Sequence, residues 1–172
     1  MNRKGKEQGS LPITDVHERE ETACTSRDLL VLILVAAKDT GIWGKQYIKY
    51  PELHAFAYLL QQEQGLFQDY IFNGFTWPRG NIGEGVDFPQ SPEMTEGLNH
   101  LVSLGFFRET TDPLAYEPTS RAELTRERLI ERLEAGGTIT FDDLRKMAGK
   151  RFCEPEQLLQ ESYQLYIDSL GR

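Results

Sequence analysis

The segment from Ser91 to Thr119 constrains the fold most, and its first part has the features of a capped amphipathic helix. Ser91 can accept hydrogen bonds from the first N–H groups of a helix, and Pro92 suits the first helical position, where a missing N–H costs nothing. Apolar residues then recur at helical spacing, which places them on one face; they are Met94, Leu98, Leu101 and Val102. Gly105 can end the helix in the left-handed conformation that glycine tolerates.

A β-hairpin is predicted directly after this helix. Residues 106–109 and 114–117 are two strand-like runs, and residues 110–113 between them have the composition of a turn. Helix, glycine, aromatic strand, turn and return strand is the element order of a winged helix. We therefore predict a mainly helical α+β fold, with a winged-helix-like core, a small β-hairpin wing and appended C-terminal helices.

The sequence predicts that the chain is divided into three regions. Residues 1–25 are polar and without periodicity, so we expect a disordered N-terminal arm. Residues 26–135 should form the winged-helix-like domain. Within this domain, residues 29–37 are apolar on every side and predict a central buried helix. Residues 80–90 are rich in glycine and predict a loop. Residues 138–172 should form a C-terminal helical hairpin. The apolar stripe expected for the helix over 120–135 is Leu124, Leu129, Ile130 and Leu133, and that of the last helix is Leu158, Leu159, Tyr163, Tyr166, Ile167 and Leu170.

Charge and cysteine content restrict the class of protein. The net charge of −8 and the pI near 5.0 disfavour a general nucleic-acid binder, which needs a basic face. Residues 50–117 contain only two basic residues against ten acidic ones, so this segment alone carries a charge of −8. Cys24 and Cys153 are too few for a disulfide framework or a four-ligand zinc site. With no signal peptide and no span-length apolar run, we expect a cytoplasmic protein without a membrane association.

No group of residues in the sequence predicts catalysis. The run from Gly80 to Gly85 lacks the Lys-Ser/Thr of a phosphate-binding loop, and Pro89-Gln90 oppose a helix start at the required place. His17, His54 and His100 show no metal-ligand or Cys–His spacing. We therefore expect a protein that is not an enzyme and has no cofactor or metal.

The helix over residues 91–104 could read DNA only if its outer face offered donors, since phosphate contacts supply most of the affinity of such complexes. That face instead presents Glu93, Glu96, Asn99 and His100. Acidic and polar residues there favour a protein partner, and Tyr70 and Trp77 in the aromatic segment 67–77 would add contacts if exposed, because interfaces are rich in aromatic residues.

DNA binding stays open as an alternative, with a homodimer formed through the C-terminal helices. The residues available for phosphate contacts are Lys45, Lys49, Arg145, Lys146, Lys150 and Arg151. Lysines and arginines converging beside His100 from distant parts of the chain would favour this alternative.

Three segments resemble the Panacea (antitoxin SocA-like) and YwgA-like domains: LHAFAYLLQQEQG (53–65), GVDFPQSPEM (85–94) and LNHLVSLGFF (98–107). In those families an apolar first helix precedes an L-x-K-L-x-Y-L-L helix, then a YGPYS-x-x-L segment, a helix ending L-x-x-x-G-hydrophobic, and a wing. Here the family's lysine and YGP core are absent and the intervening loop is longer. The resemblance, over about residues 29–133, implies a non-enzymatic domain of antitoxins, proteolysis adaptors and mobile-element proteins that acts by binding another protein.

Overall fold

The computed structural model describes residues 23–41, 47–77, 85–111 and 113–171. These residues form six helices with a small amount of antiparallel sheet, which confirms the predicted mainly helical α+β class. The expected N-terminal arm lies outside them except for residues 23–25, and Lys45 lies outside them as well. The helices are α2 (Ser26–Asp39), α3 (Tyr50–Gln64), α4 (Pro92–Ser103), α5 (Ser120–Ala135), α6 (Phe141–Phe152) and α7 (Pro155–Leu170). The strands are β1 (Ile48–Lys49), β2 (Asn73–Trp77), β3 (Val86–Gln90), β4 (Phe107–Thr111) and β5 (Leu114–Pro118).

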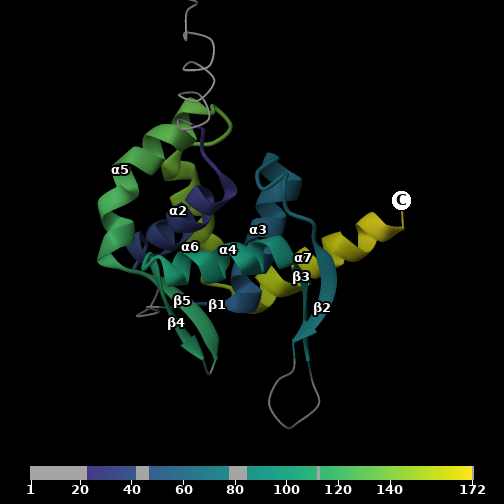
Figure 1. Ribbon diagram of the computed structural model, residues 1–172. Helices are drawn as coiled ribbons and strands as arrows, with labels where there is room; N and C mark the ends of the chain where they lie inside the picture. Colours follow the sequence, from purple (N-terminus) through teal and green to yellow (C-terminus); the bar gives the residue numbers. More distant parts are fainter. Residues whose placement is uncertain (1–22, 42–46, 78–84, 112, 172) are drawn as a thin grey trace, which may run out of the picture.

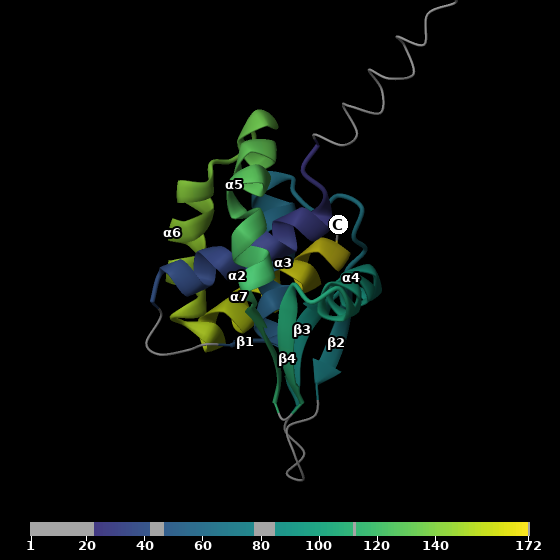
Figure 2. The same cartoon turned by 60° about the vertical axis from the view of Figure 1, so that its left-hand side comes forward.

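Helix α2 forms the centre of the molecule, as its apolar sequence predicts. Its N-cap Thr25 and the side chain of Asp28 form a reciprocal capping box. All nine residues from Leu29 to Ala37 are buried. They are covered by α4, α5, α6 and strand β5, which surround α2 (Figures 1 and 2).

The strands form two separate antiparallel sheets. The first has the order β1-β5-β4. Tyr116 on the central strand β5 lies opposite Ile48 of β1 on one side and opposite Glu109 of β4 on the other. The short β1 therefore ties the chain between α2 and α3 to the hairpin that follows α4. Gly105, with a φ of 81°, lets the chain leave α4 and enter β4.

The second sheet corrects the loop predicted over residues 80–90, because residues 86–90 form strand β3. This strand pairs with β2 along its whole length, from Asn73 opposite Gln90 to Trp77 opposite Val86. Phe88 explains the difference: its ring is fully buried and packs edge-on against Tyr50, so burial of one aromatic side chain outweighs the nearby glycines. Both hairpins point the same way from the helical body (Figures 1 and 2).

Helices α6 and α7 lie against the rest of the molecule: α6 packs on α2, and α7 packs on α3 and β3. Three residues expected to face inward do not. Leu124 is 87% exposed because it lies two positions, or about 200° of helix rotation, from the buried Ala122. Ile167 and Leu170 are exposed on the end of α7, which projects beyond the helices it packs on (Figure 1).

Candidate functional site

A buried hydrogen-bond network fixes the start of α4, whose outer face is the candidate binding surface. His54, on α3, is fully buried, and its Nδ1 accepts a hydrogen bond from the backbone N–H of Ser91 at 3.2 Å. Its Nε2 lies 3.4 Å from the hydroxyl of Thr95 on α4. That hydroxyl is also 2.5 Å from the hydroxyl of Tyr50, which accepts a hydrogen bond from the side-chain amide of Gln90 at 2.9 Å.

One arrangement of protons satisfies the whole network. Since Nδ1 of His54 accepts from a backbone N–H, its Nε2 carries the proton and donates to Thr95. Thr95 then accepts from His54 and Tyr50 and donates to the carbonyl of Ser91 at 3.2 Å. Burial lowers the pKa of His54 to about 3, so the ring is neutral at physiological pH. A neutral, fully bonded histidine positions α4 and is not a free base for catalysis.

The outer face of α4 presents the four residues predicted for partner binding. Glu96, Asn99 and His100 are exposed, and Glu93 is half-buried. The carboxylate of Glu93 accepts a hydrogen bond from the Ser91 hydroxyl at 2.8 Å. Hydrogen bonds from its own backbone N–H and from that hydroxyl lower the pKa of Glu93, which stays ionised at the first turn of the helix.

Glu93 and Glu96 line a pocket of about 390 Å³ between α4, the start of α2 and the segment before β2. We call it the acidic pocket; its lining is Thr25, Ser26, Arg27, Asp69, Tyr70, Glu93 and Glu96. Ser26 donates its hydroxyl hydrogen to Asp69. The hydroxyl of Tyr70 is buried and has no hydrogen-bond partner, and burial raises its pKa, so it stays protonated.

His100 lies in a second pocket, of about 220 Å³, beside the acidic one. We call it the arginine pocket because Arg27 from α2 and Arg128 from α5 line it together with His100. Asp28 also lies in it and is paired with Arg132 at 3.4 Å. The two pockets share Thr25 and Arg27. Neither arginine was predicted from the sequence, because each has the pattern of an ordinary solvated helix residue and nothing local indicates that both line one pocket.

The two aromatic residues predicted as partner contacts, Tyr70 and Trp77, lie in different surroundings. Tyr70 is buried, so the exposure on which its predicted partner contact depends is absent, although the residue lines the acidic pocket. Trp77 is half-buried on β2, with its ring 4.9 Å from that of Tyr50 between centroids. Phe75 is the more exposed aromatic residue of this strand.

Three of the six basic residues of the DNA alternative are engaged by acidic partners. Arg145 and Lys146 both pair with Asp142 on the same helix, and Arg151 pairs with Glu161 and, at 3.8 Å, with Glu63. Lys150 and Lys49 are exposed. The structure therefore does not gather these residues into one free basic face within the part of the chain it describes.

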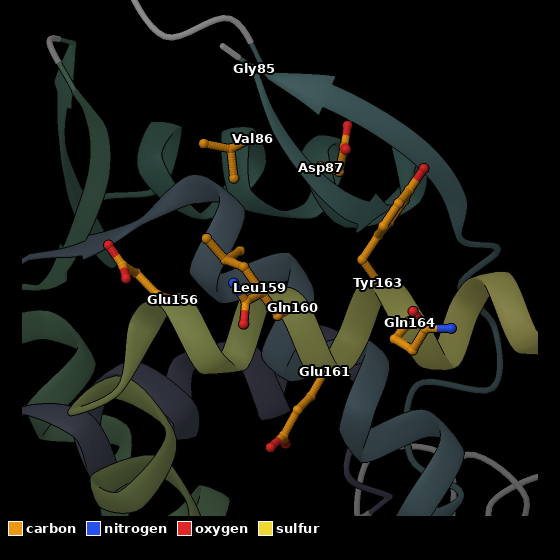
Figure 3. A pocket seen from close by; sticks show the side chains of 9 residues that line it. All are labelled: Gly85, Val86, Asp87, Glu156, Leu159, Gln160, Glu161, Tyr163 and Gln164. Atoms are coloured by element: carbon orange, nitrogen blue, oxygen red, sulfur yellow. The ribbon is translucent and has the colours of Figure 1, made fainter.

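A larger groove, of about 790 Å³, runs between β3 and α7 (Figure 3). Tyr163 points toward the hairpin there, whereas Glu161 points away from it. Acidic and amide side chains dominate its polar lining, including Asp87, Glu156 and Gln160. None of the residues predicted from the sequence as a binding site lies in this groove.

Comparison of the chain with protein-family models, with curated proteins and with solved structures finds no match. Across the described ranges, no cluster of three or more histidine, cysteine, aspartate or glutamate side chains could hold a metal ion. None of the helices described is long and apolar enough to cross a membrane.

Proposed function

We propose that this chain is a winged-helix-type domain that acts by binding a protein partner through α4, in the manner of an antitoxin or a regulatory adaptor. The strand order β1-β5-β4 supports the winged-helix interpretation, because a short strand between the first two helices joins the hairpin that follows the third. In this arrangement α4 takes the place of the recognition helix and the β4–β5 hairpin that of the wing.

The observation that carries the protein-binding proposal is the charge of the α4 surface. Glu93, Glu96 and the neighbouring Asp69 border one pocket there, and a polyanion would have to bring its phosphates against these carboxylates. An acidic recognition face suits a partner that offers cationic or neutral side chains.

DNA binding is the second candidate, and the arginine pocket is the observation that favours it. Arg27 and Arg128 come from helices far apart in the sequence and line the same pocket as His100, where a phosphate contact would need cationic groups. Two features weigh against it: Asp28 lies in the same pocket, and Glu96 borders the adjoining one. The basic residues predicted from the sequence for phosphate contacts do not add support: Arg145, Lys146 and Arg151 are already paired with carboxylates. The other members of that set are Lys45, Lys49 and Lys150.

Two measurements on the full chain separate the candidates. Fluorescence anisotropy with mixed-sequence duplex DNA at low and rising salt should show no binding; binding tighter than micromolar with a steep salt dependence would establish the DNA alternative. A photo-crosslinking amino acid at the exposed Asn99 should give a discrete protein adduct in cells of the source organism, and Glu96→Lys should abolish it. The same amino acid at Gln157, an exposed position on α7, is the matched control and should give no such adduct.

A further inference from the structure

We propose that strand β2 is a self-association edge, which pairs antiparallel with the β2 of a second copy of this chain around a two-fold axis at Phe75. This surface is separate from α4, so the inference does not depend on the proposed function. Three features support it: the hydrogen bonding of the strand, its composition, and the apolar side chains exposed beside it.

The outer edge of β2 faces no other strand. In the part of the chain that the structure describes, β2 pairs only with β3, and Figure 1 shows it at the margin of the molecule. Pro89, which lies opposite Gly74, has no N–H, and the N–H of Ser91 donates to His54. A ladder with Gly74 in a hydrogen-bonded pair would need both of these N–H groups. Gly74 therefore lies in a non-hydrogen-bonded pair of the ladder.

Two residues of β2 consequently turn their backbone groups outward. Hydrogen-bonded and non-hydrogen-bonded pairs alternate along an antiparallel ladder, so the N–H and C=O groups of Gly74 and Thr76 point away from β3. No hydrogen bond from another described residue reaches these groups. Unpaired edge groups are a template for a further strand. The partner that fits them is an extended segment of polypeptide.

Strand β2 lacks the features that usually keep an edge strand from pairing, which are charged residues and prolines. Strand β3 carries Asp87 and Pro89, and the edge strand β4 of the other sheet carries Arg108 and Glu109. Strand β2, with the sequence NGFTW, has no charge and no proline, although the surrounding residues 50–117 include ten acidic ones. Its edge is therefore open to pairing.

A second copy of β2 satisfies this edge in one register. With the two-fold axis at Phe75, Gly74 of each copy lies opposite Thr76 of the other, and each such pair exchanges two backbone hydrogen bonds. Two chains that each carry a net charge of −8 repel one another least where the contact is an uncharged strand. The contact is isologous, so association stops at a dimer.

Exposed apolar side chains extend the contact beyond the strand. Phe75 on β2 and Ile167 and Leu170 on α7 are all exposed. Helix α7 crosses β2 at Gly74, where an added Cβ would lie 3.0 Å from the ring of Tyr166, and its end extends past the strand (Figure 1). A two-fold axis between antiparallel strands is perpendicular to the sheet, so both α7 ends lie on the same face of the joined sheet. There, Ile167 and Leu170 of one copy can pack against the other.

Sedimentation velocity of the intact chain at about 5 to 500 µM tests the association. We expect a monomer–dimer equilibrium with a Kd on the order of 10–100 µM, because one strand pair and two helix ends form a contact at the small end of specific interfaces. A monomer at every concentration would overturn the inference.

Charge exchange at residue 75 tests the two-fold arrangement, since this is the residue that lies opposite itself. Phe75→Lys and Phe75→Glu should each weaken dimerisation at least tenfold, because like charges would lie directly opposite each other. An equimolar mixture of the two variants should form a heterodimer. Circular dichroism and urea unfolding check that each variant keeps its fold. Failure of two folded variants to associate when mixed would overturn the pairing at Phe75.

The backbone contact is tested by a proline. Thr76→Pro removes an outward N–H and leaves the bonds to β3 in place, so it should weaken dimerisation roughly tenfold. Thr76→Ala is the matched control: it loses the hydrogen bond from the Thr76 hydroxyl to Asp87, as the proline variant does, but keeps the N–H and should dimerise like the wild type. Equal dimerisation of the two variants would exclude the edge of β2 as the contact.

The end of α7 is tested in the same assay. Leu170→Asp should weaken dimerisation, whereas Leu124→Asp, at an exposed leucine of α5, should leave it unchanged. Equal effects of the two changes would overturn the part of the inference that concerns α7.

The outcomes also separate this inference from the proposed function. If Asn99 crosslinks a different protein and the chain stays monomeric, the inference falls and the protein-binding function stands. If the chain dimerises through β2 and Asn99 gives no adduct, the proposed function falls alone. A photo-crosslinking amino acid at Phe75 should join two copies of the chain, and capture of a different protein in their place would overturn the inference.

Discussion

The backbone N–H of Ser91 donates a hydrogen bond to Nδ1 of His54 at 3.2 Å, so a fully buried imidazole on α3 holds the N-cap of α4. The side chain of Ser91 in turn accepts from the backbone N–H of Met94. The orientation of the candidate binding helix therefore depends on a histidine that must stay neutral, which makes the stability of the fold sensitive to acid.

The first prediction concerns this sensitivity. Burial lowers the pKa of His54 from about 6.5 to about 3, so between these values the unfolded chain takes up a proton that the folded chain excludes. The stabilisation is present above pH 6.5 and is lost as the pH falls toward 3, at up to ~1.4 kcal/mol per pH unit. Urea unfolding of the wild type and of His54→Gln at pH values from 7.5 to 4 should show this extra slope in the wild type alone. His100→Gln, a change at an exposed histidine, should keep the slope; equal slopes in wild type and His54→Gln would contradict the prediction.

The second prediction concerns the unpartnered hydroxyl of Tyr70 and its contact with α4. A methyl group added at Gly97 would lie 3.3 Å from that hydroxyl oxygen, tighter than most such contacts. At a helix position without such a contact, substituting glycine by alanine stabilises the folded state by about 1 kcal/mol. We expect Tyr70→Phe to be neutral or stabilising by up to ~1 kcal/mol, because it removes a buried polar group without a partner.

Removal of the Tyr70 hydroxyl should also make Gly97→Ala more favourable. Chemical denaturation of both single variants and the double variant gives the coupling directly. We expect Gly97→Ala to gain roughly 0.5–1 kcal/mol more in the Tyr70→Phe background than in the wild type. Strict additivity would show that the hydroxyl does not limit the approach of residue 97.

Local sequence patterns predicted much of the helical fold. Caps and periodicity located α4 and its buried face, Met94, Leu98 and Leu101, and the all-apolar run placed α2 at the centre. Strand β3 was not predictable in this way, since its pairing with β2 and the burial of Phe88 come from residues elsewhere in the chain.

The candidate site was predictable only in part, for the same reason. The outer residues of one helix, such as Glu96 and Asn99, follow from periodicity. The placement of Arg27 and Arg128 in one pocket depends on how α2, α4 and α5 pack, and the network around His54 depends on contacts between α3 and α4. No pattern within one element signals either arrangement.

The third prediction concerns Arg126, which links α5 to the end of α2. Its guanidinium makes two hydrogen bonds to the carboxylate of Asp39, one of them 2.7 Å long, and lies 5.1 Å from the centroid of the Phe141 ring. Lysine cannot reproduce the paired bonds, so Arg126→Lys should lower the free energy of unfolding by about 1–2 kcal/mol. The exposed pair of Arg145 with Asp142 is the control, and Arg145→Lys should change stability by less than ~0.5 kcal/mol. Equal effects of the two changes in urea unfolding would refute a special role for Arg126.

The fourth prediction compares two leucines of α5 that look alike in the sequence. Leu129 is 3% exposed and packs in the core, whereas Leu124 is 87% exposed on the opposite side of the helix. Truncating a buried leucine costs both its transfer free energy and the cavity left behind, so Leu129→Ala should destabilise by about 2–5 kcal/mol. Leu124→Ala should stay within ~0.5 kcal/mol of the wild type, because it removes no buried surface and alanine favours helix. Thermal and urea unfolding of the two variants check the rotation of α5 about its axis. A large loss at position 124 would mean that this face of α5 is covered in solution.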